Sequence, residues 1–430
     1  MKLLEKGSKK LMNAWAFYDW ANSVYPLVIS SAIFPIYYGL IFSSKGIKSI
    51  YFLGFDFKNS ALISFVTAFA FLVVAFISPL LSGIADFIGN KKKFMQFFCF
   101  LGAFSCMGLA FLTTDHLYFG MACYFFGLIG FWGSLVFYNS YLPDIAFAEQ
   151  QDKLSAKGYS LGYIGSVVLL VLNLLFIIGK NEQESISAMQ YSFVSVGIWW
   201  IVFSQYTFYY LPSGNPTDNK LSATIVFNGF KELKKVWILL KQNIRLKKYL
   251  TAFFVYSMAV QTVMLIATYF GEQEVTWASN SEKTSGLITS ILLIQLVAVA
   301  GAILTSKASA KFGNIKVLIA INAVWVFICL GAYFVTLPIH FYVTATFVGL
   351  VMGGIQSLSR STYSKFLPDS KDTTSFFSFY DVAEKVGIVI GMSIYGIIDQ
   401  ITGSMRTAIV FIAIFFIGGL LLLFKVPKKE

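Results

Sequence analysis

The sequence predicts an all-α integral membrane protein with about twelve transmembrane helices in two six-helix halves. Hydrophobic residues make up 57% of its 430 residues and charged residues only 13%, whereas an average soluble domain has about 25% charged residues. Apolar runs of about 20 residues, the length that spans a bilayer as a helix, recur from one end of the chain to the other. A transmembrane barrel would show shorter segments of alternating hydrophobicity instead.

The first predicted span, residues 13–38, differs from a simple lipid-facing anchor. It carries Asp19 in its first turns, together with Asn22, Pro26 and Pro35. An ionisable residue costs roughly 2.5–3.5 kcal/mol at the centre of a spanning helix, and prolines free backbone carbonyls that neighbouring helices or water must satisfy. We therefore predict that this helix faces a polar path inside a bundle and that Asp19 has a partner or a wet cavity.

The remaining spans follow at short polar breaks. The predicted set covers about residues 13–38, 60–85, 94–114, 117–142, 154–178, 188–211, 249–270, 286–306, 317–336, 341–363, 376–401 and 405–424. The longest break is basic and has hydrophobic residues at helical spacing, which favours either a helix on an anionic inner leaflet or a solvated linker. The predicted domains are an N-terminal bundle (1–211), a cytoplasmic linker, with or without an amphipathic surface helix (212–246), and a C-terminal bundle (247–430).

Charge orients the chain and limits its partners. The net charge is +12, and lysines gather before the first span, after the second and within residues 220–248. By the positive-inside rule both termini and the central linker are cytoplasmic. The basic residues form no nucleic-acid-binding pattern, and the four cysteines have no metal-ligand spacing. We expect a monomer in the lipid bilayer with a small-molecule substrate, and no nucleic acid, cofactor or metal.

Two short sequence matches repeat at nearly one register. Gly89-Asn90 matches Gly313-Asn314 at a shift of 224 residues, and the Leu-Pro-Asp of residues 142–144 matches that of 367–369 at a shift of 225. A shared register predicts an internal repeat of two parallel halves. This organisation resembles the major facilitator superfamily, whose substrate site lies between the halves near the midplane.

The loop GIADFIGNKKK at residues 83–93 also resembles the loop motif of this superfamily, although Asn90 stands where a basic residue is more usual. Glycines permit a tight turn and close helix approach, and lysines hold such a loop at the inner surface. The resemblance implies that Asp86 latches the halves near residues 373–375, whereas a simple turn with a positive anchor is the alternative. The conformational residues are Gly83, Asp86, Gly89, Lys91 and Lys92.

Four blocks carry a narrower resemblance: WAFYDWANSVYP; FYNSYLPDIA with KGYSLGYIGS; VQT; and GGIQSLSRSTYSKFLPD followed by FFSFYDVAEK. They are similar to the vacuole-effluxer-like (autophagy-related efflux permease) branch of the superfamily, whose fungal members release amino acids from the vacuole. Met258 and Ala259 stand where an acidic residue and a glycine are expected. This departure weakens the inference that the chain shares the substrate or the coupling of its relatives. The resemblance implies a bacterial member in the plasma (inner) membrane.

In this superfamily the first, fourth, seventh and tenth helices line the cavity. The resemblance therefore implies the following substrate-binding or gating candidates, to which Glu384 of the eleventh span is added: Asp19, Asn22, Tyr138, Asn139, Gln261, Thr262, Gln356, Ser357, Arg360 and Glu384.

Arg360 has three candidate partners, namely Asp19, Asp381 and Glu384. Asp381 and Lys385 lie four residues apart on one helix face and can pair with each other, which leaves Glu384 for Arg360. Two interpretations stay open. Arg360 and Glu384 form a permanent bridge, or Asp19 and Arg360 form an inner gate or hold the amine and carboxylate of an amino-acid-like substrate.

These observations predict a secondary active or facilitative transporter of a small polar solute, an amino acid or related metabolite, with efflux by alternating access. Both histidines fall in outer turns, so Asp19 and Glu384 are the candidate carriers of a coupling proton. A lipid or peptidoglycan-fragment translocase of the same fold is the alternative. A membrane enzyme or an ATP-driven pump is disfavoured, because no catalytic cluster and no nucleotide-binding loop is visible.

Overall fold

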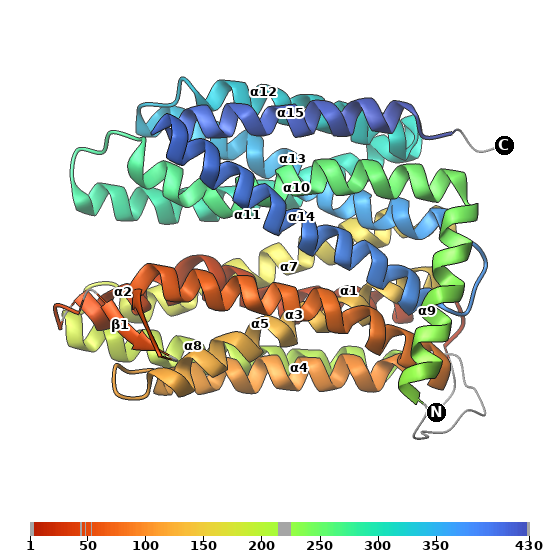
Figure 1. The fold of residues 1–430 in the computed structure, drawn as a ribbon, viewed down its shortest axis with the longest axis horizontal. Helices are drawn as coiled ribbons and strands as arrows, with labels where there is room; N and C mark the ends of the chain where they lie inside the picture. The colour runs from red at the N-terminus through yellow and green to blue at the C-terminus, as the bar shows by residue number, and fades with distance from the viewer. Residues whose placement is uncertain (1–3, 44, 48, 53, 214–224, 428–430) are drawn as a thin grey trace. The chain divides into compact units, whose positions relative to one another are not determined.

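The computed structural model describes residues 4–43, 45–47, 49–52, 54–213 and 225–427. Figure 1 shows that long helices dominate this part of the chain. A short antiparallel hairpin, β1 (Ser49–Phe52) and β2 (Phe55–Lys58), lies between the first two predicted spans. Its alternating aromatic residues suit a pleated ribbon better than a loop.

Eleven stretches of the described chain are long and apolar enough to cross a membrane: Lys9–Phe42, Leu62–Ile88, Lys91–Phe111, Leu117–Ile145, Ala148–Ile177, Glu182–Tyr210, Ile244–Gln273, Glu282–Phe312, Asn314–Ala332, Pro338–Phe366 and Met405–Phe424. They match eleven of the predicted spans. The remaining predicted span is the 30-residue helix α14 (Thr373–Thr402), which carries Asp381, Glu384 and Lys385 in its first half. The predicted all-α membrane fold is thus confirmed.

The first span contains three helical segments: α1 (Lys9–Asn22), the π-helical η1 (Tyr25–Ala32) and α2 (Ile33–Ser43). Pro26 lies at the start of η1. Proline has no N–H to donate to the preceding turn, and a wider helical turn is one way in which a helix accommodates this loss. The sequence therefore identified the position at which the helix changes its geometry.

The chain forms two compact units. The first comprises Met1–Asn139 and Leu161–Gly229, and the second comprises Ser140–Ser160 and Phe230–Glu430. The predicted boundaries after 211 and before 247 stay a prediction. The grouping of Ser140–Ser160 with the second unit was not expected from the sequence.

The first unit is built on aromatic packing and close helix contacts. Besides the first span, its helices are α3 (Asn59–Ile88), α4 (Lys91–Gly108), η2 (Leu109–Phe111), most of α5 (Leu117–Ser140), most of α7 (Ala148–Ile177) and α8 (Glu182–Tyr210). A Cβ at Gly130 would lie 2.3 Å from the backbone nitrogen of Gly102, so only glycine allows α4 and α5 to approach this closely. Trp200 is buried nearby. Small residues at contacts of this kind are typical of membrane helices.

The second unit contains the short α6 (Leu142–Ile145), the start of α7, most of α9 (Ile225–Gln242), and α10 (Ile244–Gln273), α11 (Asn280–Phe312), α12 (Asn314–Ala332), α13 (Pro338–Phe366), α14 and α15 (Met405–Phe424). A Cβ at Gly353 would lie 2.1 Å from the carbonyl oxygen of Ala298, so α11 and α13 pack backbone to backbone. The rings of Trp325 and Phe416 stack at 5.2 Å and join α12 to α15.

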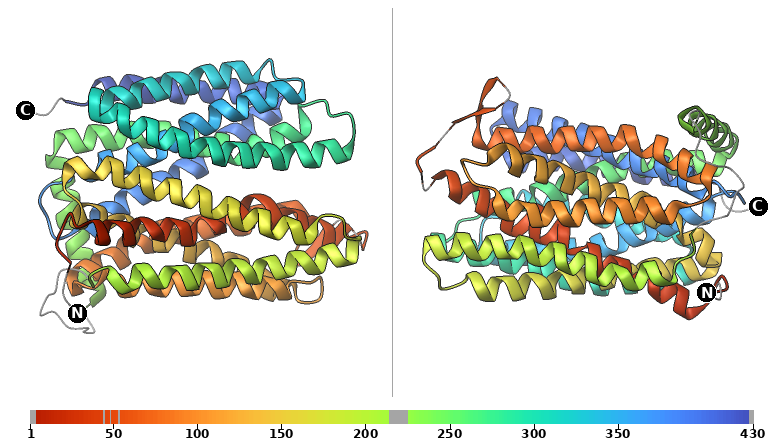
Figure 2. Two further views of the ribbon diagram at one scale, coloured as in Figure 1. Left: turned by 180° about the vertical axis from the view of Figure 1, so that it is seen from behind. Right: turned by 90° about the horizontal axis from the view of Figure 1, so that it is seen from below.

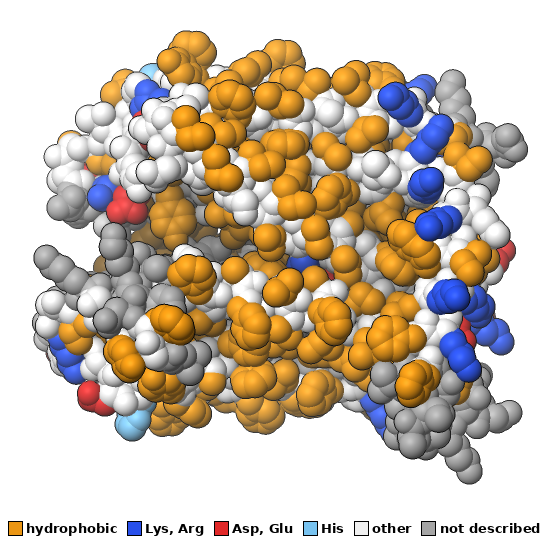
Figure 3. Space-filling view, viewed as in Figure 1, with side chains coloured by type: hydrophobic (Ala, Val, Ile, Leu, Met, Phe, Trp, Pro, Cys, Tyr) orange, Lys and Arg blue, Asp and Glu red, His pale blue; other side chains and the backbone are white. Residues whose placement is uncertain are grey.

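The surface matches a lipid environment. In Figure 3 hydrophobic side chains spread over the middle of the face in view, while Lys and Arg side chains gather toward one end. Lipid tails favour the first kind of surface and anionic headgroups the second.

Candidate transport site

Asp19 lies in the first unit, where a tyrosine holds its carboxylate. Its side chain is buried, and its Oδ2 accepts a hydrogen bond of 2.8 Å from the hydroxyl of Tyr138 on α5. Tyr138 is itself fixed by Trp15 of α1, because their rings stack at 4.5 Å and the Trp15 Nε1–H donates to the Tyr138 carbonyl at 2.9 Å. One partner of Asp19 is therefore Tyr138, which the sequence had singled out as a cavity residue but not as a partner of Asp19.

Asn22 lies one turn beyond Asp19 on α1. It is buried, and the Ser23 hydroxyl donates to its Oδ1 at 3.4 Å. Its Nδ2 has no hydrogen-bond partner within the described part of the chain. Residues three apart share one helix face, so the Asp19 carboxylate and the Asn22 Nδ2 group lie on the same face of α1.

Helix α7 approaches this stretch of α1 closely. A Cβ at Gly162 would lie 2.3 Å from the Ser23 hydroxyl oxygen, and one at Gly165 would lie 2.9 Å from the Trp20 carbonyl oxygen. Both glycines belong to the block KGYSLGYIGS, so its glycines permit helix contact in the first unit. Asn139, the neighbour of Tyr138, is half-buried.

In the second unit, α14 presents a buried ion cluster. The Nζ of Lys385 lies 2.7 Å from Asp381 Oδ1 and 2.8 Å from Glu384 Oε2. The Lys385 side chain is 1% exposed and that of Glu384 is 17% exposed. The Nε2 of Gln261 on α10 donates to Glu384 Oε1 at 2.8 Å.

The Asp381–Lys385 pair is confirmed, but the expectation that Glu384 is left for Arg360 is wrong. Within the described residues the Glu384 carboxylate contacts Gln261 and Lys385. A lysine has a long flexible stem, so its ammonium reaches the acid next to it as well as the acid one turn away. Lys385 was missed as a site residue because the sequence assigned it to Asp381 alone.

Arg360 of α13 is held by the start of α7. Its Nε donates to the Ser155 hydroxyl at 2.9 Å, its Nη2 donates to the Ser155 carbonyl at 3.1 Å, and its guanidinium carbon lies 4.2 Å from the centre of the Tyr159 ring. Stacking on an aromatic face stabilises a desolvated guanidinium. Asp19 belongs to the first unit and Arg360 to the second, and their pairing stays a prediction.

The other polar candidates make mostly local contacts. The hydroxyls of Thr262 and Ser357 donate to carbonyls of their own helices, at Met258 and Gly353, both at 2.7 Å. Such back-bonding satisfies a hydroxyl in an apolar environment. Gln356 Nε2 lies 3.6 Å from the sulfur of Met264. Their roles as substrate ligands stay predictions.

The loop after α3 has the predicted tight turn. Gly89 has φ 72°, and its N–H donates to the Ala85 carbonyl at 2.9 Å, which is a common end for a helix. Gly83 also permits close approach, because a Cβ there would lie 2.4 Å from the Gly229 carbonyl oxygen. Asp86 is half-buried, and its latch to residues 373–375 stays a prediction.

The lysines of this loop are not simple surface anchors. Lys91 is buried, and the Lys92 Nζ donates to the Leu211 carbonyl at 2.9 Å. Lys92 therefore joins the start of α4 to the end of α8. Carbonyls at a helix end attract cations, and the assignment of Lys91 and Lys92 to the conformational motif stays a prediction.

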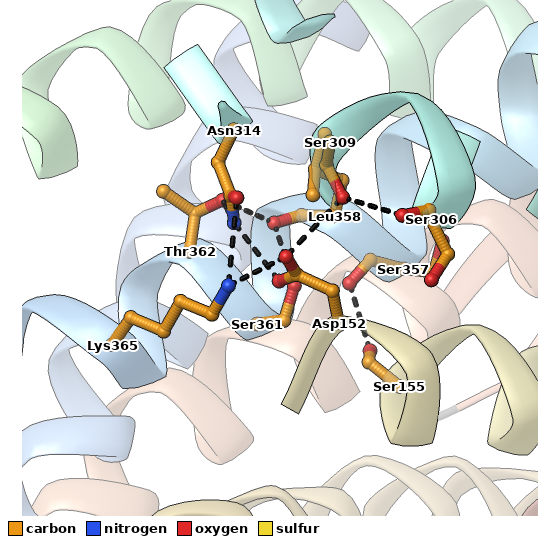
Figure 4. Close-up of polar contacts among 10 residues, drawn as sticks. All are labelled: Asp152, Ser155, Ser306, Ser309, Asn314, Ser357, Leu358, Ser361, Thr362 and Lys365. Carbon is orange, nitrogen blue, oxygen red and sulfur yellow. Dashed lines mark hydrogen bonds and ion pairs between the residues drawn. The ribbon is translucent and has the colours of Figure 1, made fainter. Parts of the chain in front are cut away.

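A second polar network, shown in Figure 4, joins the start of α7 to the other helices of the second unit. The carboxylate of Asp152 accepts from Asn314 Nδ2 at 2.9 Å, from Lys365 Nζ at 2.5 Å and from the Ser309 hydroxyl at 3.2 Å. Asn314 also donates to Thr362 at 2.9 Å. Sequence reasoning missed this network, although the repeated Gly-Asn pair had marked Asn314.

The fold is that of the major facilitator superfamily. The chain superposes on the Escherichia coli fucose:proton symporter FucP with a TM-score of 0.68, at 15% identity and with 98% of each chain covered. It superposes on the proton:xylose symporter XylE with a TM-score of 0.69, at 12% identity and with 98% of this chain and 96% of that chain covered. Identities this low show the fold alone.

The chain belongs to the family described as "Vacuole effluxer Atg22 like", whose model matches residues 7–430. It is 30% identical to the uncharacterized MFS-type transporter YxiO of Bacillus subtilis (strain 168), with 98% of this chain and 95% of YxiO covered. It is 24% identical to Autophagy-related protein 22-1 of Aspergillus terreus, with 88% and 76% covered. The predicted family is confirmed, and the chain is a multi-pass membrane transporter of the major facilitator superfamily, not an enzyme.

Proposed function

We propose that this transporter moves a small zwitterion, an amino acid or related metabolite, out of the cytoplasm by alternating access. The family description as a vacuole effluxer supports transport of a small solute across a membrane, and movement out of the cytoplasm is the proposed direction. The Bacillus relative supports a bacterial plasma membrane, and the lysine distribution supports cytoplasmic termini. Transport is either coupled to a proton or driven by the solute gradient alone.

The neighbouring side chains of Asp19 and Asn22 carry this proposal. The Asp19 carboxylate is buried and accepts a hydrogen bond from the Tyr138 hydroxyl, and a carboxylate inside a membrane span is a suitable ligand for a cationic group of a substrate. Asn22 offers an Nδ2–H group that has no acceptor within the described residues. An α-amino acid has the complementary groups, since its ammonium fits the carboxylate and its own carboxylate accepts from the amide. Polar residues inside membrane spans are costly and for that reason mark substrate pathways.

Counterflow in proteoliposomes tests the proposal. Vesicles loaded with a single unlabelled amino acid should accumulate the labelled form of the same solute, and the effect should saturate. Replacing Asp19→Asn should raise KM by roughly ten- to a hundred-fold, because a hydrogen bond to a charged group contributes about 1.5–3 kcal/mol. Asn22→Ala should also raise KM, by less.

Asn322→Ala is the matched control. Asn322 is also buried in a spanning helix, but its Nδ2 donates to the Leu318 carbonyl of its own helix. Transport by this variant should equal that of the wild type once the amount of folded protein in the vesicles is matched. If no amino acid exchanges while labelled phospholipid crosses the membrane, the protein is a lipid translocase and the proposal is wrong.

A further inference from the structure

Helix α9 (Ile225–Gln242) is distinct from the spanning helices in direction and in composition. Figure 1 and the right-hand view of Figure 2 show that it runs across the direction of the long helices. Its inner face buries Val236 and Leu240. Its other side, which we call the outer face of α9, presents large apolar residues and lysines at helical spacing: Phe230, Lys231, Lys234, Trp237, Ile238 and Lys241.

The second unit fixes α9 at the ends of spanning helices. The Nζ of Lys235 lies 2.8 Å from Asp372 Oδ2, just before α14 begins. The ring of Trp237 lies 5.4 Å from that of Phe379. At its C-terminal end, Asn243 Nδ2 donates to the carbonyl of Phe366, the last residue of α13, at 3.3 Å. The ends of spanning helices lie at the membrane–water interface, so α9 lies at the same level.

The apolar residues of the outer face are open to the surroundings. Phe230 is 53% exposed, Ile238 is 46% exposed and Trp237 is 43% exposed. A helix that only linked two bundles through water would present polar residues at these positions. Aromatic and aliphatic side chains at the interface instead favour the boundary between headgroups and acyl chains.

The charges of the outer face select the lipid. Lys231, Lys234 and Lys241 are exposed on it, and its six residues include no acid. The acids near α9 already have partners, because both Glu232 and Asp372 pair with Lys235. In Figure 3 many Lys and Arg side chains gather on the side on which α9 is drawn in Figure 1. The surface therefore complements a negatively charged layer.

We propose that the outer face of α9 binds the anionic phospholipid headgroups of the leaflet at which α10 begins. Phe230, Trp237 and Ile238 insert below the headgroups, and the three lysines contact the phosphates. Each lysine near an anionic surface strengthens binding by about five-fold. This inference does not depend on which solute is transported.

Hydrogen exchange on the full-length protein in vesicles tests it. In vesicles of phosphatidylcholine containing one-third phosphatidylglycerol, amides of residues 230–242 should exchange roughly ten-fold more slowly than in phosphatidylcholine alone. High salt should remove much of the difference, because it screens exposed charges. The triple variant K231Q/K234Q/K241Q should show the faster exchange in both kinds of vesicle.

The triple variant K307Q/K311Q/K316Q is the matched control, because these exposed lysines lie around the turn between α11 and α12. Its α9 amides should behave as in the wild type. Equal exchange in the two kinds of vesicle would overturn the proposal, and so would protection that appears only when a soluble extract is added. A second variant, Ile238→Ser, should weaken protection while leaving its salt dependence in place, which separates the apolar contribution from the charge.

Discussion

The two units of the transporter hold their buried acids in different ways. In the first unit Asp19 accepts a hydrogen bond from the neutral hydroxyl of Tyr138. In the second unit Asp381 and Glu384 share the ammonium of Lys385. A hydrogen bond from a neutral hydroxyl contributes less than one from a charged group, whereas a buried ion cluster loses much of its stabilisation when one member is removed. We therefore expect the cluster to contribute to stability, while the ligand roles of Asp19 and Glu384 stay predictions.

The largest expected effect comes from removing the cation of the cluster. Lys385→Met leaves two carboxylates in a mostly apolar interior, and we expect it to destabilise the protein by about 3–5 kcal/mol. The measurement is the apparent unfolding temperature in detergent. Tyr138→Phe, which removes one hydroxyl from Asp19, should cost about 1.5–3 kcal/mol at most.

A compensating variant makes this result specific. Combining Lys385→Met with Asp381→Asn and Glu384→Gln removes the uncompensated charge, so much of the lost stability should return. A Lys385→Met protein that unfolds at the wild-type temperature would show that the cluster is not structural, and the comparison between the units would fail.

An intermediate effect is expected at the two copies of the repeated Gly-Asn turn. In the second unit Asn314 donates to Asp152 and to Thr362. In the first unit Asn90 accepts from the backbone N–H of Lys93 at 3.3 Å and caps α4. Asn314→Ala should cost about 2 kcal/mol, because one of its two bonds goes to a charged group.

Asn90→Ala should cost about 1 kcal/mol, the usual contribution of a helix cap. Both values can be measured as shifts of the unfolding temperature under one set of conditions. Equal shifts would mean that the two turns are equivalent despite their different partners.

The smallest effect is expected at Lys235 of α9. Its hydrogen bond to Asp372 raises the pKa of the Lys235 ammonium above the ordinary value of 10.5. A group whose pKa is higher in the folded than in the unfolded state stabilises the protein at pH values below its unfolded pKa. This stabilisation is lost as the pH rises through the folded pKa. The side chain is 57% exposed, so solvent screens the pair and the effect is small.

Unfolding temperatures recorded on either side of pH 10.5 check this prediction. The wild type should lose slightly more stability than Lys235→Gln as the pH rises through this region. If the two proteins respond identically to pH, the pair with Asp372 does not stabilise the docked position of α9.

The membrane fold could be predicted from the sequence because the requirements that the bilayer places on each span concern neighbouring residues in the chain. Each span must satisfy its backbone within one helix and present apolar residues to lipid, and both requirements leave a continuous signal of about 20 residues. The Gly-Asn and Leu-Pro-Asp repeats added the two-half organisation. The span α14 was still recognisable although it carries Asp381, Glu384 and Lys385.

The partners of the polar residues needed the tertiary structure. The family resemblance placed Asp19 and Tyr138 on helices that are expected to line the cavity, and the structure shows the hydrogen bond between them. The sequence could not show that Ser155 holds Arg360, because residues about 200 positions apart carry no local signal of their contact.

The sequence by itself determined the membrane environment, the number and approximate limits of the spans, and the family. Only the tertiary structure decided which charge pairs with which, and that Ser140–Ser160 belongs with the second unit. The physical reason is that hydrophobic spans are selected one helix at a time by the bilayer. A buried polar group, in contrast, takes its partner from whichever helix the packing brings within hydrogen-bond distance.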